Sequence, residues 1–235
     1  MSEIRPFSSV DFSMIDTPAL VNLALQRGSN LKDILPARGK NTDWREDYAR
    51  ALEEKRDTVL KRVWDEVAAS YLTTRSAFVA SRPWRVADIG CGQGLIDLMI
   101  QDDTGCDLVL IDIEETDDLY FGFKSGSGAG YASLNLAKTF LMANGVKESS
   151  IETVNPKHMD VSSIAPVDLS CSFISCGFHY PLATYQEFFQ RQTRSAMVVD
   201  VRNRNLKEQA IDAYGRPFVI GEDPEGKWKR YFIKK

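Results

Sequence analysis

An acidic residue and three glycines mark the place in this chain where chemistry is most strongly indicated. Residues 86–94 read VADIGCGQG, so a short apolar run ends in Asp88 and opens onto Gly90, Gly92 and Gly94. An amphipathic run follows at once, and the pattern predicts a strand, a tight turn and a helix start. Glycines tolerate positive φ and let a ligand lie against bare backbone. We therefore expect a binding site here; the alternative is an ordinary corner between a strand and a helix.

A second acidic residue ends the next predicted strand. Residues 107–112 read DLVLID, and Asp112 lies about 20 residues beyond the glycines, where nucleotide-binding α/β units place the carboxylate that holds a ribose. We expect Asp112 to accept hydrogen bonds from two ribose hydroxyls, since a charged acceptor strengthens such bonds. Ile113 would then lie against an adenine. A solvated strand end is the other interpretation, and the acidic residues that follow could shift the assignment by one or two positions.

The stretch from Asp88 to Gly94 reads DIGCGQG and resembles the first motif of class I S-adenosylmethionine-dependent methyltransferases. The resemblance implies that Asp88 lies near the ammonium group of the cofactor, and that Gly90, Cys91, Gly92 and Gly94 form the cofactor loop. NAD-binding Rossmann domains usually read GxGxxG, and no third glycine occurs in that register here. S-adenosylmethionine is thus the expected cofactor, and a dehydrogenase is the weaker alternative.

From residue 81 to residue 235 the pattern alternates between strands and helices. Strands are predicted at 85–89, 108–113, 151–155, 167–175 and 196–201, helices at 94–100, 131–143 and 185–191, and a terminal hairpin at 217–221 and 228–233. Such alternation predicts a mainly parallel sheet with helices on both faces. The resemblance implies a Rossmann-like, doubly wound α/β sheet of seven strands with the last one antiparallel.

Residues 1–80 carry no motif of this kind and form a predicted helical extension. Thr17 and Pro18 have the types expected at an N-cap and the first helical position, ahead of a helix that ends at Gln26. A second, long helix is predicted from 43 to 71, where apolar residues recur three, four or seven apart. The extension either packs as a plain helical layer on the sheet or caps the cofactor and substrate.

Two further strand ends carry candidate residues. After the third strand, the resemblance implies that Asp160 meets the adenine amino group and that Met159 lies beside the ring. A loop aspartate without a ligand is an equally good interpretation. The resemblance implies that the end of the fourth strand faces the methyl group of the cofactor.

The fourth strand runs into residues 175–181, which read SCGFHYP. Ser175 is expected to touch the cofactor. His179 is one of only two histidines in the chain, and imidazole near its ordinary pKa is the usual base for taking a proton from a hydroxyl. Phe178 and Tyr180 are candidate walls for the substrate. The other interpretation is a structural histidine that bonds a backbone group.

An aromatic and glycine-rich insert and one arginine complete the candidate substrate residues. Tyr120, Phe123 and Tyr131 lie in or beside residues 117–130, which are predicted to form a lid or a wall of the substrate site. Arg202, after the fifth strand, would contact an anionic or sugar-like substrate. A surface loop and a solvated arginine are the respective alternatives.

Composition excludes several classes of protein. The net charge of −4 argues against a general nucleic-acid binder. The four cysteines lack CxxC spacing, which argues against zinc. Asp200 has no adjacent Asn and the fourth strand ends without a carboxylate, so we expect no metal. No apolar run approaches the ~20 residues of a membrane span, and we expect a cytoplasmic protein with no membrane partner.

We therefore hypothesise a methyltransferase that moves a methyl group to a hydroxyl of a small polar acceptor, with His179 as general base. The resemblance to sugar and small-molecule O-methyltransferases suggests a sugar-containing acceptor. We expect a small-molecule acceptor as partner, regard nucleic acid as the weaker option and allow for a homodimer. An RNA or protein methyltransferase with the same cofactor, or a non-catalytic cofactor-binding relative, are the alternatives.

Overall fold

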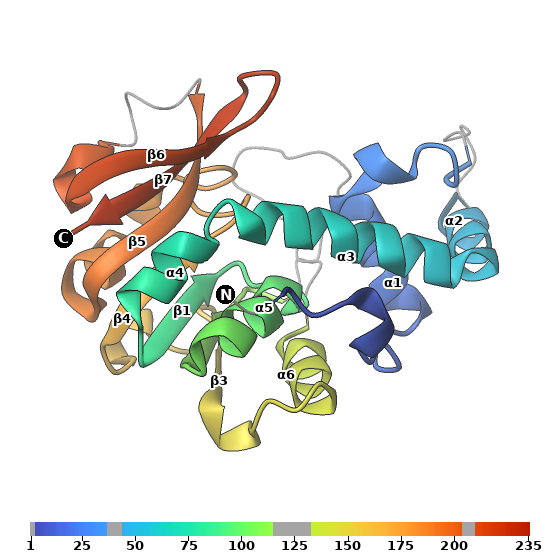
Figure 1. Cartoon of the computed structure of the whole chain (residues 1–235), viewed down its shortest axis with the longest axis horizontal. Helices are drawn as coiled ribbons and strands as arrows, with labels where there is room; N and C mark the ends of the chain where they lie inside the picture. The colour runs from blue at the N-terminus through green and yellow to red at the C-terminus, as the bar shows by residue number, and fades with distance from the viewer. Residues whose placement is uncertain (1–2, 37–43, 115–132, 204–209) are drawn as a thin grey trace.

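The computed structural model describes residues 3–36, 44–114, 133–203 and 210–235, and its centre is a single seven-stranded sheet (Figure 1). The strands are β1 Arg85–Ile89, β2 Asp107–Ile111, β3 Ile151–Val154, β4 Val167–Ser172, β5 Thr193–Arg202, β6 Arg216–Glu222 and β7 Trp228–Lys234. Their order is β3-β2-β1-β4-β5-β7-β6. The first five are parallel, and β7 runs antiparallel to both β5 and β6. The predicted sheet, including its antiparallel last strand, is confirmed.

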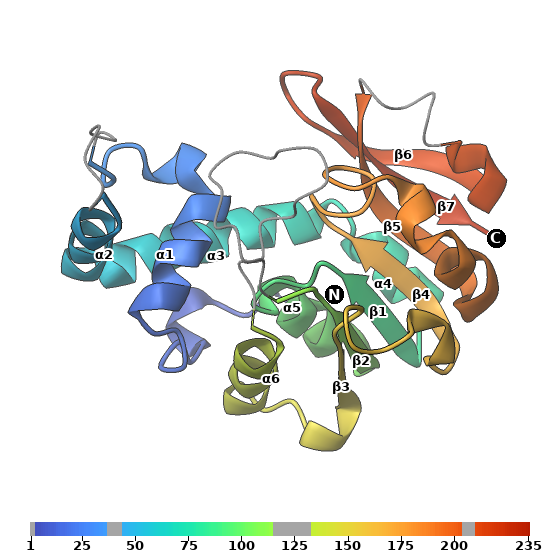
Figure 2. The ribbon, with the colours of Figure 1, turned by 180° about the vertical axis from the view of Figure 1, so that it is seen from behind.

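Six α-helices accompany the sheet in the part of the chain that the structure describes. They are α1 Thr17–Gln26, α2 Trp44–Glu54, α3 Arg56–Leu72, α4 Arg75–Ser81, α5 Leu95–Thr104 and α6 Leu134–Ala143. Figures 1 and 2 show that α3 runs past the edge of the sheet. As a result, α1 and α2 lie beside the sheet and not over its middle. None of the helices described is both long and apolar enough to cross a membrane.

The two faces of the sheet are covered differently. Because successive strand residues point to opposite faces, Val86 packs with the α-helices whereas Ala87 and Ile89 face the other way. That second face is covered by single-turn elements: 3₁₀ segments at Leu182–Tyr185 and Ile211–Tyr214 and a π-helical turn at Phe188–Gln192. The short helix predicted at 185–191 is present, formed by the end of the 3₁₀ segment and the π-helical turn. Phe188 and Phe189 are buried there, and one wide turn places both adjacent rings against the sheet.

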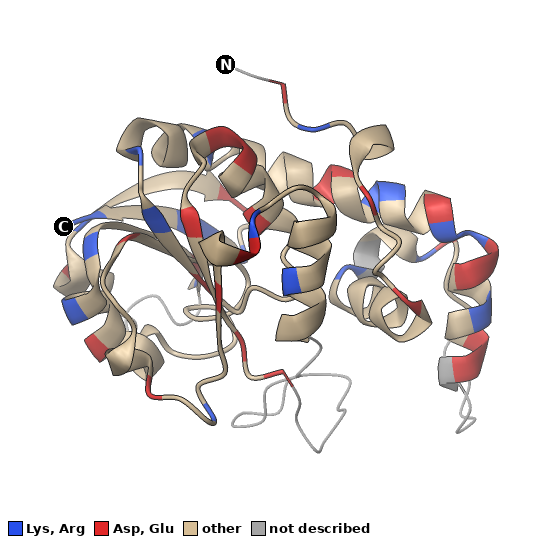
Figure 3. Cartoon of the chain, turned by 90° about the horizontal axis from the view of Figure 1, so that it is seen from below, with Lys and Arg blue, Asp and Glu red and all other residues tan. Residues whose placement is uncertain are grey.

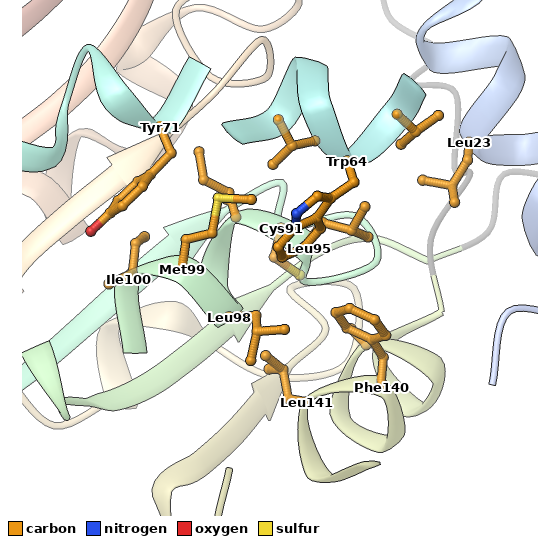
Figure 4. Close-up of a cluster of buried hydrophobic side chains, with 14 of the residues drawn as sticks. Leu23, Trp64, Tyr71, Cys91, Leu95, Leu98, Met99, Ile100, Phe140 and Leu141 are labelled. Carbon is orange, nitrogen blue, oxygen red and sulfur yellow. The ribbon is translucent and has the colours of Figure 1, made fainter. Parts of the chain in front are cut away.

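The N-terminal helices and the sheet share one hydrophobic cluster. Figure 4 shows side chains from α1 and α3, among them Leu23 and Trp64, meeting residues of α5 and α6. Six consecutive residues of α5, Leu95–Ile100, are buried, because this helix lies between the sheet and α3. Polar contacts add to this packing: the Tyr71 hydroxyl donates to Asp103 at 2.7 Å, and Asp11 exchanges hydrogen bonds with Asn144.

The sequence prediction is wrong in detail at the N-terminal helices. The long helix predicted at 43–71 is interrupted at Lys55, whose φ of −125° lies outside the helical region. The break lets α2 pack on α1, where Glu53 accepts hydrogen bonds from Thr17 and Arg56, both at 2.7 Å. Thr17 is the first helical residue rather than the cap, and Asp16 caps α1 by accepting from the Ala19 N–H. Basic and acidic residues are interspersed along α2 and α3, whereas α1 carries none (Figure 3).

Candidate active site

A cavity of about 390 Å³ opens where β1, β2 and β4 end, and α1 and α3 form its opposite wall. Ligands of open α/β sheets bind at the carboxyl ends of strands. The cavity is lined by residues of the glycine-rich turn, the β2 and β4 ends, and the two helices: Leu23, Leu25, Gln26, Arg27, Val67, Ser70, Asp88, Ile89, Gly90, Cys91, Gly92, Gln93, Leu95, Ile96, Asp112, Ile113, Phe173, Ile174, Ser175, His179, Tyr180, Thr184 and Tyr185.

The conformation of the glycine-rich turn depends on residues without side chains. Gly90 has a φ of 82°, and its N–H donates to the Ile111 carbonyl at 2.7 Å. A Cβ at Gly90 would lie 2.2 Å from the Ser175 hydroxyl oxygen, so the loop after β4 can approach only because this residue is glycine. A Cβ at Gly92, with φ of 60°, would point across the cavity toward Gln26. The third glycine, Gly94, is the N-cap of α5 and lies outside the lining.

Asp112 lies beside this turn, as its position after β2 predicts. Its Oδ2 accepts from the Gly92 N–H at 3.0 Å and its Oδ1 from the Glu114 N–H at 3.3 Å. Burial raises the pKa of Asp112, and these backbone donors oppose the rise. A carboxylate can accept about four hydrogen bonds, so Asp112 retains acceptor capacity toward the cavity. Ile113, the next residue, also lines the cavity.

Asp88 is the most deeply buried acid of the lining. It is 2% exposed, and its Oδ1 has no hydrogen-bond partner among the residues described. Burial and the neighbouring charge of Asp97 raise the pKa of Asp88 well above its ordinary value. An orphaned buried carboxylate oxygen at a cavity wall fits a ligand that brings a donor or a positive charge.

The turn after β4 presents His179 and Tyr180 to the cavity. The Ser175 carbonyl accepts from three backbone N–H groups, those of Phe178, His179 and Tyr180, at 2.7–3.2 Å. The Tyr180 hydroxyl is buried and has no partner within the described part of the chain. Burial and the charge of Asp112 raise the pKa of Tyr180, so its phenol remains a hydrogen-bond donor at neutral pH.

A buried ion pair fixes the backbone that leads into this turn. The guanidinium of Arg230 donates to Asp200 at 2.6 and 2.8 Å, and the two side chains are 1% and 0% exposed. Asp200 also accepts from the N–H of Ile174, whose φ of 54° is unusual for a β-branched residue. Arg230 further donates to the Ser70 carbonyl at 2.8 Å. The pair therefore joins the β4 end to α3, the two sides of the cavity.

The helical wall contains lining residues that the sequence analysis did not identify. Arg27 lines the cavity while pairing with Glu66 at 2.8 Å. Gln93 donates through Nε2 to the Ala19 carbonyl of α1 at 3.0 Å, and its buried Oε1 has no partner among the residues described. Gln93 lies between Gly92 and Gly94 of the glycine motif, and this position in the sequence could have indicated that it belongs to the site. Nothing in the local sequence of α1 pointed to the site, because its place is set by packing with α3.

Several predicted site residues lie away from the cavity. Met159 is 46% exposed, and Asp160 accepts from the N–H and the hydroxyl of Ser162 in its own turn. Neither is among the residues that line the cavity. The chain leaves β3 at Val154, and five intervening residues carry Asp160 away from the strand end.

The predicted substrate residues divide into three groups. Tyr180 lines the cavity, whereas Phe178 and Arg202 do not: they stack on each other, with the guanidinium carbon 4.2 Å from the ring centroid. Tyr120, Phe123 and Tyr131, with the insert 117–130, lie outside the described residues.

Of the predicted cofactor residues, the structure brings seven to the cavity: Asp88, Gly90, Cys91, Gly92, Asp112, Ile113 and Ser175.

Comparisons with known proteins identify the fold. No protein family model matches the chain, and no curated protein matches its sequence. Among solved structures, the methyltransferase domain of bacterial CtHen1 is 14% identical and has a TM-score of 0.50, over 71% of this chain and 97% of that one.

Two full methyltransferase structures are similar over more of the chain. An O-methyltransferase family protein from Burkholderia thailandensis is 12% identical, with a TM-score of 0.49, over 93% of this chain and 71% of that one. The S-adenosylmethionine-dependent methyltransferase SibL is 10% identical, with a TM-score of 0.49, over 93% and 69%. At these identities the likeness concerns the fold alone. Together with the strand order, the CtHen1 match shows that the chain has the fold of class I S-adenosylmethionine-dependent methyltransferases.

Proposed function

We propose that this protein is an S-adenosylmethionine-dependent methyltransferase that acts on a hydroxyl of a small polar, sugar-like acceptor. The single observation that carries the proposal is the composition of one cavity. The glycine-rich turn and Asp112 form one part of it, His179 and Tyr180 form another, and helices α1 and α3 close the opposite side.

The residues of the glycine-rich turn and the β2 end suit this cofactor. Asp112 has acceptor capacity for the two ribose hydroxyls, and Ile113 offers an apolar surface to the adenine. The orphaned Oδ1 of Asp88 suits the α-ammonium group of the methionine portion. When bound, S-adenosylmethionine supplies an electrophilic methyl group on a positively charged sulfur.

The turn after β4 would position and activate the acceptor. His179 takes the proton from the acceptor hydroxyl as its oxygen attacks, and a neutral imidazole is suited to that role near pH 7. The Tyr180 phenol, kept protonated by its surroundings, donates a hydrogen bond that orients the acceptor. Most of the rate enhancement would come from holding the reacting atoms in line and excluding water. The wall formed by α1 and α3 excludes water.

A labelled-methyl assay tests this proposal. The protein is incubated with S-adenosylmethionine carrying a labelled methyl group and a panel of hydroxylated small molecules, sugars and glycosides first. We expect His179→Gln to lower kcat about 10²- to 10⁴-fold, with cofactor affinity kept. His158→Gln is the matched control, because His158 is exposed and outside the cavity. Equal turnover by the two variants would remove His179 from the reaction, and transfer to RNA or protein alone would contradict the small acceptor.

A further inference from the structure

A second carboxylate lies behind Asp88, and the proposed reaction makes no use of it. Asp97 is in the first turn of α5 and is 0% exposed, within the run of buried residues between the sheet and α3. Neither of its carboxylate oxygens has a hydrogen-bond partner among the residues that the structure describes. Most positions of this buried run are apolar, and a buried acid without a partner is costly.

Asp88 and Asp97 lie close enough for their two carboxyl groups to interact directly. Two ionised carboxylates are both acceptors only and repel each other, so the pair can bond only when it holds at least one proton. Burial raises the pKa of Asp97 to about 7 and that of Asp88 well above its ordinary value. Burial without hydrogen-bond partners therefore favours the neutral form of both carboxyl groups, and such a pair titrates as a unit.

Among the residues that the structure describes, the titratable groups near the pair are all acids. The Cys171 thiol of β4 contacts Asp88, while Cys91 of the glycine-rich turn, Cys106 before β2 and Asp112 after β2 lie near enough to interact electrostatically. Within the described ranges, no group of three or more potential ligands gathers to hold a metal ion. Asp88 lines the cavity and Asp97 does not, so only Asp88 can meet a cationic ligand directly.

We propose that Asp97 is a positioning residue that shares protons with Asp88, and that binding of a primary ammonium group at Asp88 expels one proton from the pair. The inference rests on the proposed function, because the ammonium is that of the cofactor's methionine portion. Before binding at pH 6 the pair holds two protons. In the complex Asp88 is ionised and lies against the ammonium group. Asp97 keeps the remaining proton and donates a hydrogen bond through it to Asp88. The other proton passes to the buffer.

The consequence is a cofactor affinity that rises with pH below neutrality. Each proton released on binding changes the dissociation constant tenfold per pH unit, by the same linkage that couples protonation to folding. The product S-adenosylhomocysteine carries the ammonium group, whereas 5′-methylthioadenosine has the same nucleoside without the amino-acid tail. Only the first ligand should expel the proton.

Calorimetric titration at pH 6, in buffers of different ionisation heat, counts the protons released. For the unmodified protein we expect nearly one proton with S-adenosylhomocysteine and nearly none with 5′-methylthioadenosine. In Asp97→Asn the amide donates to Asp88 without a shared proton, and release with S-adenosylhomocysteine should fall to less than half. Asp102→Asn, an exposed carboxylate on the same helix, is the control and should release as much as the unmodified protein.

The outcomes separate this inference from the proposed function. Binding heat with no proton release, or the same release with both nucleosides, overturns the proton exchange while cofactor binding stands. Unchanged release in Asp97→Asn overturns the role of Asp97. Heat from neither nucleoside overturns the proposed function and the inference with it. The comparison of S-adenosylhomocysteine with 5′-methylthioadenosine uses the unmodified protein, so its result does not depend on the Asp97→Asn variant.

Discussion

Replacing Asp200 by alanine should strongly destabilise the fold. The substitution removes both charge-assisted hydrogen bonds to Arg230, at 2.6 and 2.8 Å, and leaves a guanidinium that is 1% exposed. Removing one partner of a buried pair costs about 3–5 kcal/mol. The remaining bonds of Arg230 to the Ser70 carbonyl and the Thr73 hydroxyl offset only part of the lost interaction. We therefore expect the free energy of unfolding to fall by about 3–5 kcal/mol.

Urea denaturation followed by tryptophan fluorescence measures this loss, since the Trp228 ring lies 5.4 Å from the Arg230 guanidinium. The double variant Asp200→Leu with Arg230→Met should recover most of the stability, because an apolar pair carries no desolvation penalty. Asp33→Ala is the control: Asp33 also accepts two hydrogen bonds from one arginine, Arg62, but on the surface, where solvent screens the pair. A loss below about 1 kcal/mol for Asp200→Ala would refute the reasoning.

Two further changes test other parts of the account. Gly177→Ala should destabilise the turn after β4, because its Cβ would lie 2.7 Å from the Asp200 carbonyl oxygen at a φ of 93°. Gly226→Ala also has positive φ but open space, so the difference between their urea midpoints isolates the clash. Asp97→Asn should stabilise the protein by about 1–3 kcal/mol at pH 7.5. The pKa of Asp97 is about 7 in the folded protein and about 4 in the unfolded chain. The free energy of unfolding of the unmodified protein therefore decreases as the pH rises from about 4 to about 7. Denaturation at pH 4 should show little of this gain.

Much of the sheet could be predicted from the sequence, because its strands carry strong local signals. The apolar runs that end in Asp88 and Asp112 mark β1 and β2, and the glycines between them require a turn. These same residues form the cofactor side of the cavity, since the carboxyl ends of neighbouring parallel strands meet. The local sequence pattern therefore predicted the cofactor side of the cavity, because the position of that side depends on the sheet alone.

The remainder depends on packing between distant segments. The break at Lys55 follows from the fit of α2 on α1, and no Gly or Pro marks it. Arg27 reaches the cavity through the placement of α1, and Asp97 looks in sequence like a solvated acid at a helix start. Asp160 remains a prediction from the resemblance alone: it lies six positions past Val154, where β3 ends, and its carboxylate accepts hydrogen bonds within its own turn.

Calorimetric titration with S-adenosylmethionine measures whether the cavity at the ends of β1 and β2 binds this cofactor. We expect one binding site, with a dissociation constant raised about 10- to 100-fold in Asp112→Ala, which loses charge-assisted hydrogen bonds to the ribose. Asp160→Ala is the matched control, because this carboxylate is engaged in its own turn outside the cavity and should leave affinity unchanged. Absence of binding by the unmodified protein, or equal weakening in both variants, would contradict the cofactor site described at the ends of β1 and β2.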